Sequence, residues 1–129
     1  MSFEIAFPPN PDELPGARAA LRTWLQEVGI DGEHATADVL IVTSELVTNG
    51  VFHDGGGPIT LRAAEHRGDV SIEVTTVDHL PGHRPTYRDV EGSAEGGRGL
   101  TIVRALSRGY DVQQHDRQRV TTCWIPAMP

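Results

Sequence analysis

The order of helical and strand-like segments limits the folds that this chain can adopt. Apolar residues recur at helical spacing over 13–28 and 34–53, and a short helix is predicted after Gly99. Apolar and polar residues alternate, as they do in strands, over 3–7, 59–64, 70–77, 110–114 and 120–125. The alternating strand-helix-strand units of a doubly wound parallel sheet are therefore missing. The order instead predicts an α+β, two-layer sandwich, with a mixed, mostly antiparallel sheet covered by helices on one face.

Length and composition fit one globular domain over 1–129. The chain has 129 residues, of which 38% are hydrophobic and 22% charged, and it contains no repeat, linker or low-complexity segment. Its formal net charge of −7 disfavours nucleic acid as a partner. No run approaches the roughly 20 apolar residues of a membrane span, and the N-terminus lacks the features of a secretory signal. We therefore expect a cytoplasmic protein that binds neither nucleic acid nor membrane.

The absence of Lys and the presence of a single Cys are both informative. The 11 basic residues are all Arg. Without Lys the chain cannot contain a Walker-A lysine, a Schiff-base lysine or a Ser-Lys dyad, so any phosphate would be bound by backbone amides, a metal ion or Arg. The lone cysteine, Cys123, excludes an intramolecular disulfide. Its apolar neighbours Trp124 and Ile125 predict a buried structural thiol.

Three polar residues follow the second predicted helix at intervals of four: Glu45, Asn49 and His53. Each interval turns the helix by only about 40°, so the three side chains form one stripe beside the apolar face. A carboxylate next to a carboxamide suits a general base paired with a Mg²⁺ ligand, because Mg²⁺ takes few protein oxygens and keeps phosphates and waters. A solvated helix face has the same spacing, so the stripe alone leaves both interpretations open.

A glycine-rich segment, 96–99, precedes the third predicted helix. Glycine lets a backbone approach a ligand closely, and the first N–H groups of a helix are unpaired and electropositive. Together they can bind phosphate without Lys, and Arg98 adds a guanidinium for an anionic oxygen. A flexible turn before a helix is the alternative.

Thr76 lies near the end of the strand predicted over 70–77. Asp78 follows two residues later and therefore lies on the same side. A carboxylate there could accept hydrogen bonds from a base that carries an amino group, or it could only cap the following loop. That loop, 78–97, is long for so small a domain, which is typical of a functional loop or lid.

Two other kinds of site find less support. Asp78, His79 and His83 lie close together like part of a zinc site, but no fourth ligand is indicated. The Gly-x-Ser-x-Gly elbow of serine hydrolases is absent.

Together and in this order, these segments resemble the GHKL, or Bergerat-fold, ATPases. The closest similarity is to their small stand-alone branch, the anti-sigma-factor serine/threonine kinases. The run from Leu40 to His53, LIVTSELVTNGVFH, resembles the N box, which is the most specific of the motifs. The run Gly97-Arg98-Gly99-Leu100 resembles the second glycine box, and 121–126 resembles the closing threonine strand. The similarity covers nearly the whole chain.

The resemblance implies a role for each matching residue. Glu45 matches the general base, Asn49 matches the ligand of Mg²⁺, and His53 fits the pattern without an assigned role. The other predicted contacts to ATP are Thr76, Asp78, Gly97, Arg98, Gly99, Leu100 and Thr122. The implied reaction transfers the γ-phosphoryl group of ATP to Ser or Thr of an anti-anti-sigma (STAS-type) partner, with rate enhancement from positioning and charge neutralisation.

One position departs from the family pattern. The family carries Asp at the end of the strand, where it binds the amino group of adenine, and this chain has Thr76 there. Asp78 could substitute only if the strand or the loop shifts. We expect the exchange to weaken adenine binding by about 1–2 kcal/mol.

Two functional classes follow. The first is a nucleotide-dependent anti-sigma-type kinase that binds a sigma factor or an anti-anti-sigma protein, and the family also leads us to expect a homodimer. The second, suggested by Thr76, is a binding module that keeps the fold and the partner surface without catalysis. A histidine-kinase catalytic domain ranks third, because no dimerising phosphoacceptor helix pair is predicted. The negative charge predicts partners with basic or neutral docking surfaces.

Overall fold

In the part of the chain that the structure describes, a five-stranded sheet forms one layer and three long helices form the other. The computed structural model describes residues 1–53, 57–77 and 94–127. Its strands are β1 (Ser2–Phe7), β2 (Ile59–His66), β3 (Asp69–Val77), β4 (Gly109–His115) and β5 (Gln118–Pro126). Its helices are the short η1 (Pro11–Glu13), then α1 (Leu14–Glu27), α2 (Glu33–His53) and α4 (Ala94–Leu106).

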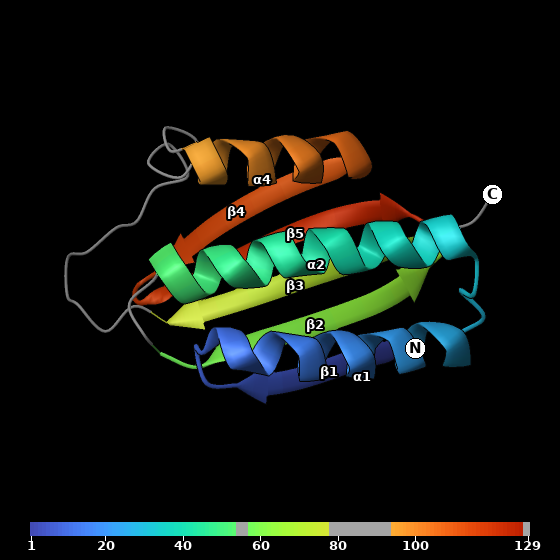
Figure 1. Cartoon of the computed structure of the whole chain (residues 1–129), viewed down its shortest axis with the longest axis horizontal. Helices are drawn as coiled ribbons and strands as arrows, with labels where there is room; N and C mark the ends of the chain where they lie inside the picture. The colour runs from blue at the N-terminus through green and yellow to red at the C-terminus, as the bar shows by residue number, and fades with distance from the viewer. Residues whose placement is uncertain (54–56, 78–93, 128–129) are drawn as a thin grey trace.

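The strands lie in the order β1-β2-β3-β5-β4, and every pairing is antiparallel. All three long helices lie on the same side of the sheet, with α2 between α1 and α4 (Figure 1). The predicted α+β, two-layer architecture with helices on one face is therefore confirmed. No parallel pair occurs among the described strands, so the sheet is antiparallel rather than mixed.

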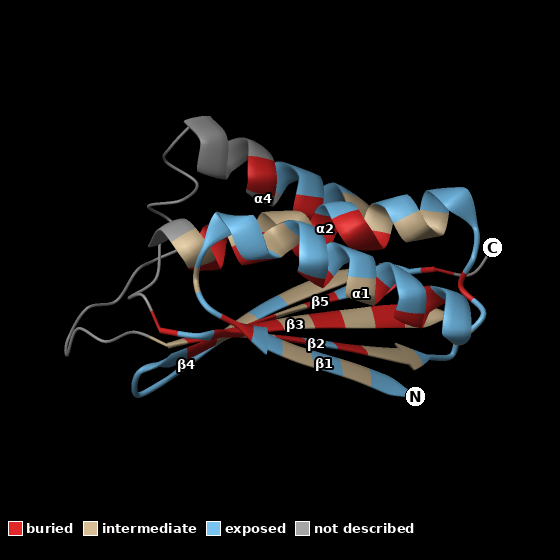
Figure 2. Cartoon of the chain, turned by 60° about the horizontal axis from the view of Figure 1, so that its bottom comes forward, coloured by how far each residue is buried: buried red, intermediate tan, exposed pale blue. Residues whose placement is uncertain are grey.

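The core lies between the two layers and follows from the alternation within the strands. Leu61 of β2 and Ile72 of β3 are fully buried. The helices cover one face of the sheet, and buried segments recur along β2 and β3 (Figure 2). Leu21 and Leu25 of α1 and Val42 of α2 cover them and are fully buried. Burying each such side chain contributes about 1.5–3 kcal/mol, so this shared core fixes α2 against the sheet.

One glycine with positive φ follows the end of α1, and another completes the turn between β2 and β3. Gly29 follows α1 with φ +87°, and the amide of Ile30 then bonds back to the carbonyl of Leu25 at 2.8 Å. Arg67 and Gly68 both have positive φ, and they form the two-residue turn between β2 and β3. Such turns match the twist of the hairpin strands. The hairpin in turn sets the register of β3, which carries part of the site described below.

None of the helices in the described part of the chain is long and apolar enough to cross a membrane.

Cys123 is the buried thiol that its apolar neighbours predicted. It lies on the helix-facing side of β5, fully buried, and pairs in register with Ile72 of β3. Burial raises the pKa of the Cys123 thiol from 9.0 to about 12, because the apolar surroundings penalise the thiolate. The thiol therefore belongs to the core.

This raised pKa predicts a loss of stability at high pH. Between pH 9 and about 12 the unfolded thiol ionises while the folded thiol keeps its proton. Within that window the free energy of unfolding should fall by up to about 1.4 kcal/mol per pH unit, and below it Cys123 should contribute no pH dependence. Urea unfolding of the natural chain and of Cys123→Ala, each at pH 8 and pH 10.5, measures how much the free energy of unfolding of each protein changes with pH. Equal slopes would contradict the prediction.

Candidate functional site

Four segments that the sequence analysis singled out lie at one end of the molecule. They are the C-terminal half of α2, the end of β3, the beginning of β5 and the first turns of α4 (Figure 1). The antiparallel pairing of β3 with β5 places Val77 opposite Gln118, so one strand ends where the other begins. The fold thus brings these distant segments together.

The carboxylate of Glu45 on α2 lies against the backbone of Gly99 on α4. A Cβ atom added to Gly99 would overlap Oε2 of Glu45 and would stand 3.4 Å from its Cδ. A side chain at position 99 would force the carboxylate of Glu45 to move away from this position. The predicted meeting of the second helix with the glycine-rich segment is therefore present in the structure.

Asn49, one turn after Glu45, is a buried amide with an unsatisfied group. The residue is 7% exposed, and its Nδ2 has no hydrogen-bond partner in the part of the chain that the structure describes. On the same helix, the buried Thr43 donates its hydroxyl to the carbonyl of Val39 at 2.8 Å. Buried polar groups nearly always have partners, so an orphaned one indicates a place that a ligand or water completes.

A second glycine, Gly50 on α2, brings the helix close to the sheet. A Cβ atom on Gly50 would stand 2.7 Å from the methyl Cγ2 of Thr76 and 3.7 Å from Cδ1 of Ile59. Thr76 is 4% exposed, and it lies on the helix-facing side of β3. Asn49 directly precedes Gly50 in the sequence, so it lies beside the place where α2 contacts the end of β3.

β5 adds two polar residues to the same face of the sheet. Arg119 pairs in register with Thr76, Thr121 pairs with Val74, and both β5 residues are about 95% buried. Each of the three polar side chains, Thr76, Arg119 and Thr121, already takes part in an interaction within the protein. They form a polar edge to an otherwise apolar layer.

The predicted nucleotide contact at Thr122 requires a correction. Thr122 pairs with Glu73 and lies on the open face of the sheet, beside Arg62 and Trp124, on the side away from Glu45 and Asn49. Thr121 occupies the helix-facing position instead. Successive strand residues point to opposite faces, so a shift of one residue in the register of a strand exchanges its two faces. Because Thr121 and Thr122 are the same residue type, the sequence alone could not show which of them faces the helices.

The glycine-rich segment also differs from the prediction. The helix was expected to begin after Gly99, but α4 begins at Ala94, so 96–99 lie inside its first turns. Ala94 and Glu95 are good helix formers, and each glycine that follows costs the helix only about 1 kcal/mol. The unpaired backbone amides of the helix start are therefore those of 94–97 rather than those around Leu100.

Several predicted residues are placed only in part. Asp78 and most of the predicted loop 78–97 lie outside the described residues. His53 ends α2, while Arg98 and Leu100 lie within α4, and the structure gives the backbone positions of all three.

The whole chain was also compared with known proteins. A family model described as "Histidine kinase-like ATPase domain" matches residues 7–124. The chain belongs to the histidine kinase-like ATPase domain family. The predicted GHKL superfamily is thus confirmed, and the chain is an ATP-binding, kinase-like module of that superfamily.

Solved structures of this fold include two histidine kinases. The histidine kinase domain from the Erythrobacter litoralis EL346 blue-light activated histidine kinase matches with a TM-score of 0.58 and 14% identity, over 88% of this chain and 61% of that one. Acinetobacter baumannii histidine kinase AdeS matches with a TM-score of 0.53 and 15% identity, over 71% of this chain and 47% of that one. The present chain thus spans less than two thirds of either, and the likeness shows the fold.

In this ATPase-family chain the donor set at the site suits Mg²⁺. No group of three or more His, Cys, Asp or Glu side chains among the described residues could form a metal site. Mg²⁺ bound to a nucleotide takes most of its ligands from phosphates and waters, so a single buried amide oxygen from Asn49 is a sufficient protein contribution. Only the Oδ1 of Asn49 could be a ligand of Mg²⁺, whereas its Nδ2, which has no partner among the described residues, is a donor that suits a phosphate oxygen. The two ends of the Asn49 amide thus fit a magnesium nucleotide.

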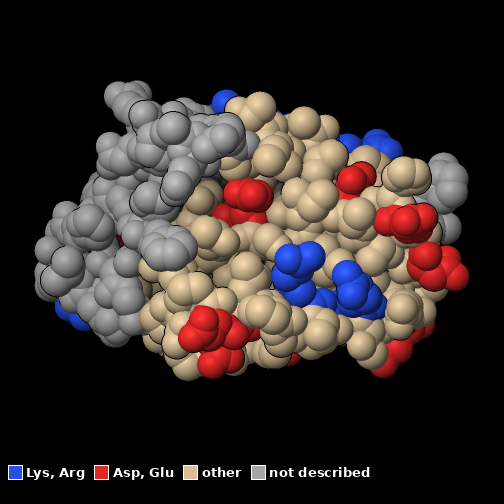
Figure 3. Space-filling view, viewed as in Figure 1, with Lys and Arg blue, Asp and Glu red and all other residues tan. Residues whose placement is uncertain are grey.

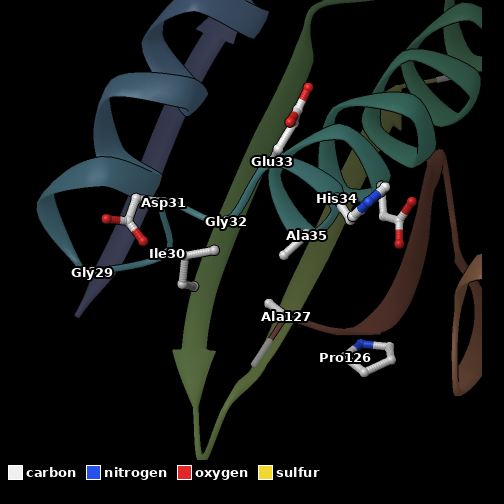
Figure 4. A pocket seen from close by; sticks show the side chains of 10 residues that line it. Gly29, Ile30, Asp31, Gly32, Glu33, His34, Ala35, Pro126 and Ala127 are labelled. Atoms are coloured by element: carbon white, nitrogen blue, oxygen red, sulfur yellow. The ribbon is translucent and has the colours of Figure 1, made fainter. Parts of the chain in front are cut away.

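A separate hollow lies at the other end of α2. It has a volume of about 490 Å³, and Figure 4 shows its lining, which runs from Gly29 to Ala35 and includes Asp38, Pro126 and Ala127. It is wide open, and none of the predicted site residues lines it. We therefore place the candidate site at Glu45 and Asn49, where the orphaned amide and the glycine contact occur.

The contact of Gly50 with Thr76 predicts opposite effects for two glycine substitutions. Gly50→Ala should lower the free energy of unfolding by about 1–3 kcal/mol, because its Cβ overlaps the Thr76 methyl. Gly16→Ala, on the exposed face of α1 with no atom within 4 Å, should raise it by about 0.5–1 kcal/mol. Adding Thr76→Ser to Gly50→Ala removes the methyl and should recover stability. Urea unfolding of the three variants measures these changes. Equal effects of Gly50→Ala and Gly16→Ala would contradict the contact between Gly50 and Thr76.

The orphaned amide predicts that Asn49 lowers the stability of the nucleotide-free protein. Asn49→Leu should raise the free energy of unfolding by about 1 kcal/mol, because it removes a buried donor without a partner. The matched control is Thr43→Val, which removes a buried hydroxyl that does have a partner and should give no gain. A loss of stability in Asn49→Leu larger than that in Thr43→Val would show that the amide is satisfied.

Proposed function

We propose that this chain is an anti-sigma regulatory factor with serine/threonine kinase activity. In this proposal it binds ATP with Mg²⁺, phosphorylates Ser or Thr of an anti-anti-sigma (STAS-type) protein, and binds a sigma factor in the alternative state of a partner switch. The observation that carries the proposal is the contact of the Glu45 carboxylate with Gly99, one helical turn from the orphaned amide of Asn49. Together they form a base and a ligand group beside a helix start.

Glu45 is placed to act as the general base. Its Oε2 accepts the proton of the attacking Ser or Thr hydroxyl, whose oxygen bonds to the γ-phosphorus while the bond to the bridging oxygen of ADP breaks. Gly99 keeps the backbone of α4 close to this carboxylate without covering it. This proximity of Glu45 to Gly99 is the observation that supports the role of general base in the proposal.

Asn49 and the start of α4 would hold the triphosphate. The Asn49 amide would offer its oxygen to Mg²⁺, and the backbone amides of 94–97, at the start of α4, would supply partial positive charge for phosphate oxygens. When bound, Mg²⁺ neutralises charge on the triphosphate. This arrangement agrees with a chain whose basic residues are all Arg.

Thr76 favours a second candidate, a binding module without catalysis. On the helix-facing side of the sheet at this end, the described polar side chains are Thr76, Arg119 and Thr121, and none is a carboxylate. Among the described residues, the end of β3 therefore offers no carboxylate for the contact that adenine makes with Asp in the family. Such a module would bind its protein partner whether or not it turns over nucleotide.

Charge supports protein partners rather than nucleic acid. The net charge is −7, and Figure 3 shows acidic side chains scattered over the helix-covered face around a small basic patch. Partners with basic or neutral docking surfaces should therefore associate more weakly as salt increases. The proposal also includes that the chain forms a homodimer and is located in the cytoplasm.

Calorimetry and a transfer assay test the kinase proposal together. Purified protein should bind Mg²⁺-nucleotide, Asn49→Ala should remove the dependence on Mg²⁺, and Glu45→Gln should slow radiolabel transfer to an anti-anti-sigma partner by about 10²–10⁴-fold while Kd changes little. Asp38→Asn, on the same helix but remote from the site, is the control and should leave both unchanged.

The outcomes separate the two candidates. Flat calorimetry with millimolar ATP and GTP would overturn nucleotide binding altogether. Partner binding without transfer, unaffected by Glu45→Gln, would favour the binding module. Phosphohistidine instead of phosphoserine or phosphothreonine on the partner would instead favour a histidine-kinase module.

A further inference from the structure

The open face of the sheet, which none of the described helices covers, carries an exposed tryptophan. All three long helices lie on the other face (Figure 2). Trp124 of β5 is 39% exposed, and it points to the open face because its neighbours Cys123 and Ile125 are buried on the helix-facing side. An accessible aromatic ring of this size is a typical anchor of a protein–protein interface.

The indole of Trp124 is already held in place. A Cβ atom on Gly109, its register partner on β4, would stand 3.1 Å from Cε3 and 3.7 Å from Cζ3 of the indole, so the ring lies against the backbone of Gly109. The carbonyl of Trp124 accepts a hydrogen bond from the amide of Arg108 at 2.7 Å. A side chain that is ordered beforehand loses little conformational entropy when a partner covers it.

A hollow lies beside Trp124 on the same face. It has a volume of about 280 Å³, and Trp124 forms part of its lining. Across the neighbouring strands, the residues in register with Trp124 are all small and also line the hollow: Ser71 on β3, Ala64 on β2 and Ser2 on β1. The open face therefore has both a protruding aromatic ring and a recess that suits one.

A protrusion and a recess on one surface allow a two-fold dimer, in which each copy places its protrusion in the recess of the other. A two-fold axis parallel to the strands, between β2 and β3, exchanges β2 with β3 and β1 with β5. It places Trp124 of each copy over Ser2 of the second copy, and Ser71 over Ala64. Packed sheets lie about 10 Å apart, a gap that a tryptophan side chain spans.

The charged residues of the open face suit the same symmetry. In the row next to Trp124, Arg62 pairs with the carboxylates of Glu4 and, at 3.1 Å, of Glu73. The axis between β2 and β3 places Arg62 of each copy over Glu73 of the second copy, and Glu4 over Thr122. Opposite charges therefore meet twice, and no carboxylate of this row lies directly over another.

The open face is also large enough for a dimer. Five strands are roughly 24 Å wide, and strands of six to nine residues are roughly 20–30 Å long. The face thus covers roughly 500–700 Å² before the relief of its side chains is added, and a standard stable interface buries about 800 Å² per partner.

We propose that the chain forms its homodimer through the open face of the sheet, with Trp124 of each copy seated in the hollow of the other. The proposal rests on the homodimer of the proposed function and assigns its surface. The helix layers, which carry Glu45 and Asn49, then lie on opposite outer sides of the dimer. Both candidate sites thus stay accessible to nucleotide and to protein partners.

Sedimentation velocity over a range of micromolar concentrations tests the proposal. The natural chain should sediment as a dimer that dissociates on dilution. Trp124→Ser should raise the Kd of the dimer at least tenfold, because it truncates the anchor of the interface. Ile102→Ser is the matched control, since Ile102 is 38% exposed but lies on α4 in the helix layer, and it should leave the Kd unchanged.

A second variant, Ala64→Arg, tests the recess instead of the anchor. It keeps Trp124 and the contact with Gly109, fills the hollow with a long side chain, and should also raise the Kd at least tenfold. Circular dichroism of each variant checks that the fold is kept. Fluorescence of the natural chain gives an independent readout: emission should shift to the red on dilution as Trp124 leaves the interface, while Trp24, which is 6% exposed, stays in the core.

The outcomes separate this proposal from the kinase proposal. A natural chain that stays monomeric at submillimolar concentration overturns the homodimer and its surface but leaves the kinase proposal intact. A dimer that both open-face variants leave unchanged, or that Ile102→Ser disrupts, uses another surface and overturns only the present proposal. Shielding of Trp124 by an anti-anti-sigma protein in a monomeric chain would assign the face to that partner and also overturns it. Failure to bind nucleotide overturns the kinase proposal and leaves the dimer unaffected.

Discussion

Two glycines allow helix α2 to approach its neighbours so closely that the site forms around it. At Gly99 the backbone of α4 comes against the carboxylate of Glu45, and at Gly50 the backbone of α2 comes against the methyl of Thr76. A Cβ atom at position 99 would displace the carboxylate of Glu45, and one at position 50 would push α2 away from Thr76 of the sheet. The alignment of base, amide and helix start therefore depends on these two close approaches, and the core behind them holds α2 in place.

Much of the fold follows from local signals in the sequence. Period-two alternation located all five strands, and the glycine after α1 ended that helix at the predicted residue. The motif on α2 placed Glu45 and Asn49 on one stripe, and the structure brings that stripe to the glycine-rich segment. These predictions succeeded because each depends on the repeat of a single helix or strand, or on one residue with a special φ.

What the sequence did not predict depends on relations between elements. The Thr121-Thr122 pair reads alike in either register, and only the pairing with β3 decides which threonine faces the helices. α4 begins earlier than predicted because Ala94 and Glu95 favour a helix. The three closely spaced glycines that follow disfavour it only slightly, so the sequence did not show where the helix begins. The depth at which Arg119 is buried was also missed, because a lone Arg near the start of a strand is usually solvent-exposed.

The central claim is that α2 and α4 bind one magnesium nucleotide between them. Hydrogen exchange of the backbone amides, measured with and without Mg²⁺-nucleotide, tests it most directly, because it locates the ligand without relying on turnover. We expect added protection in both 45–53 and 94–100, with no change in 29–38, which borders the hollow at the other end of α2. Protection confined to 29–38, or to only one of the two site segments, would contradict it.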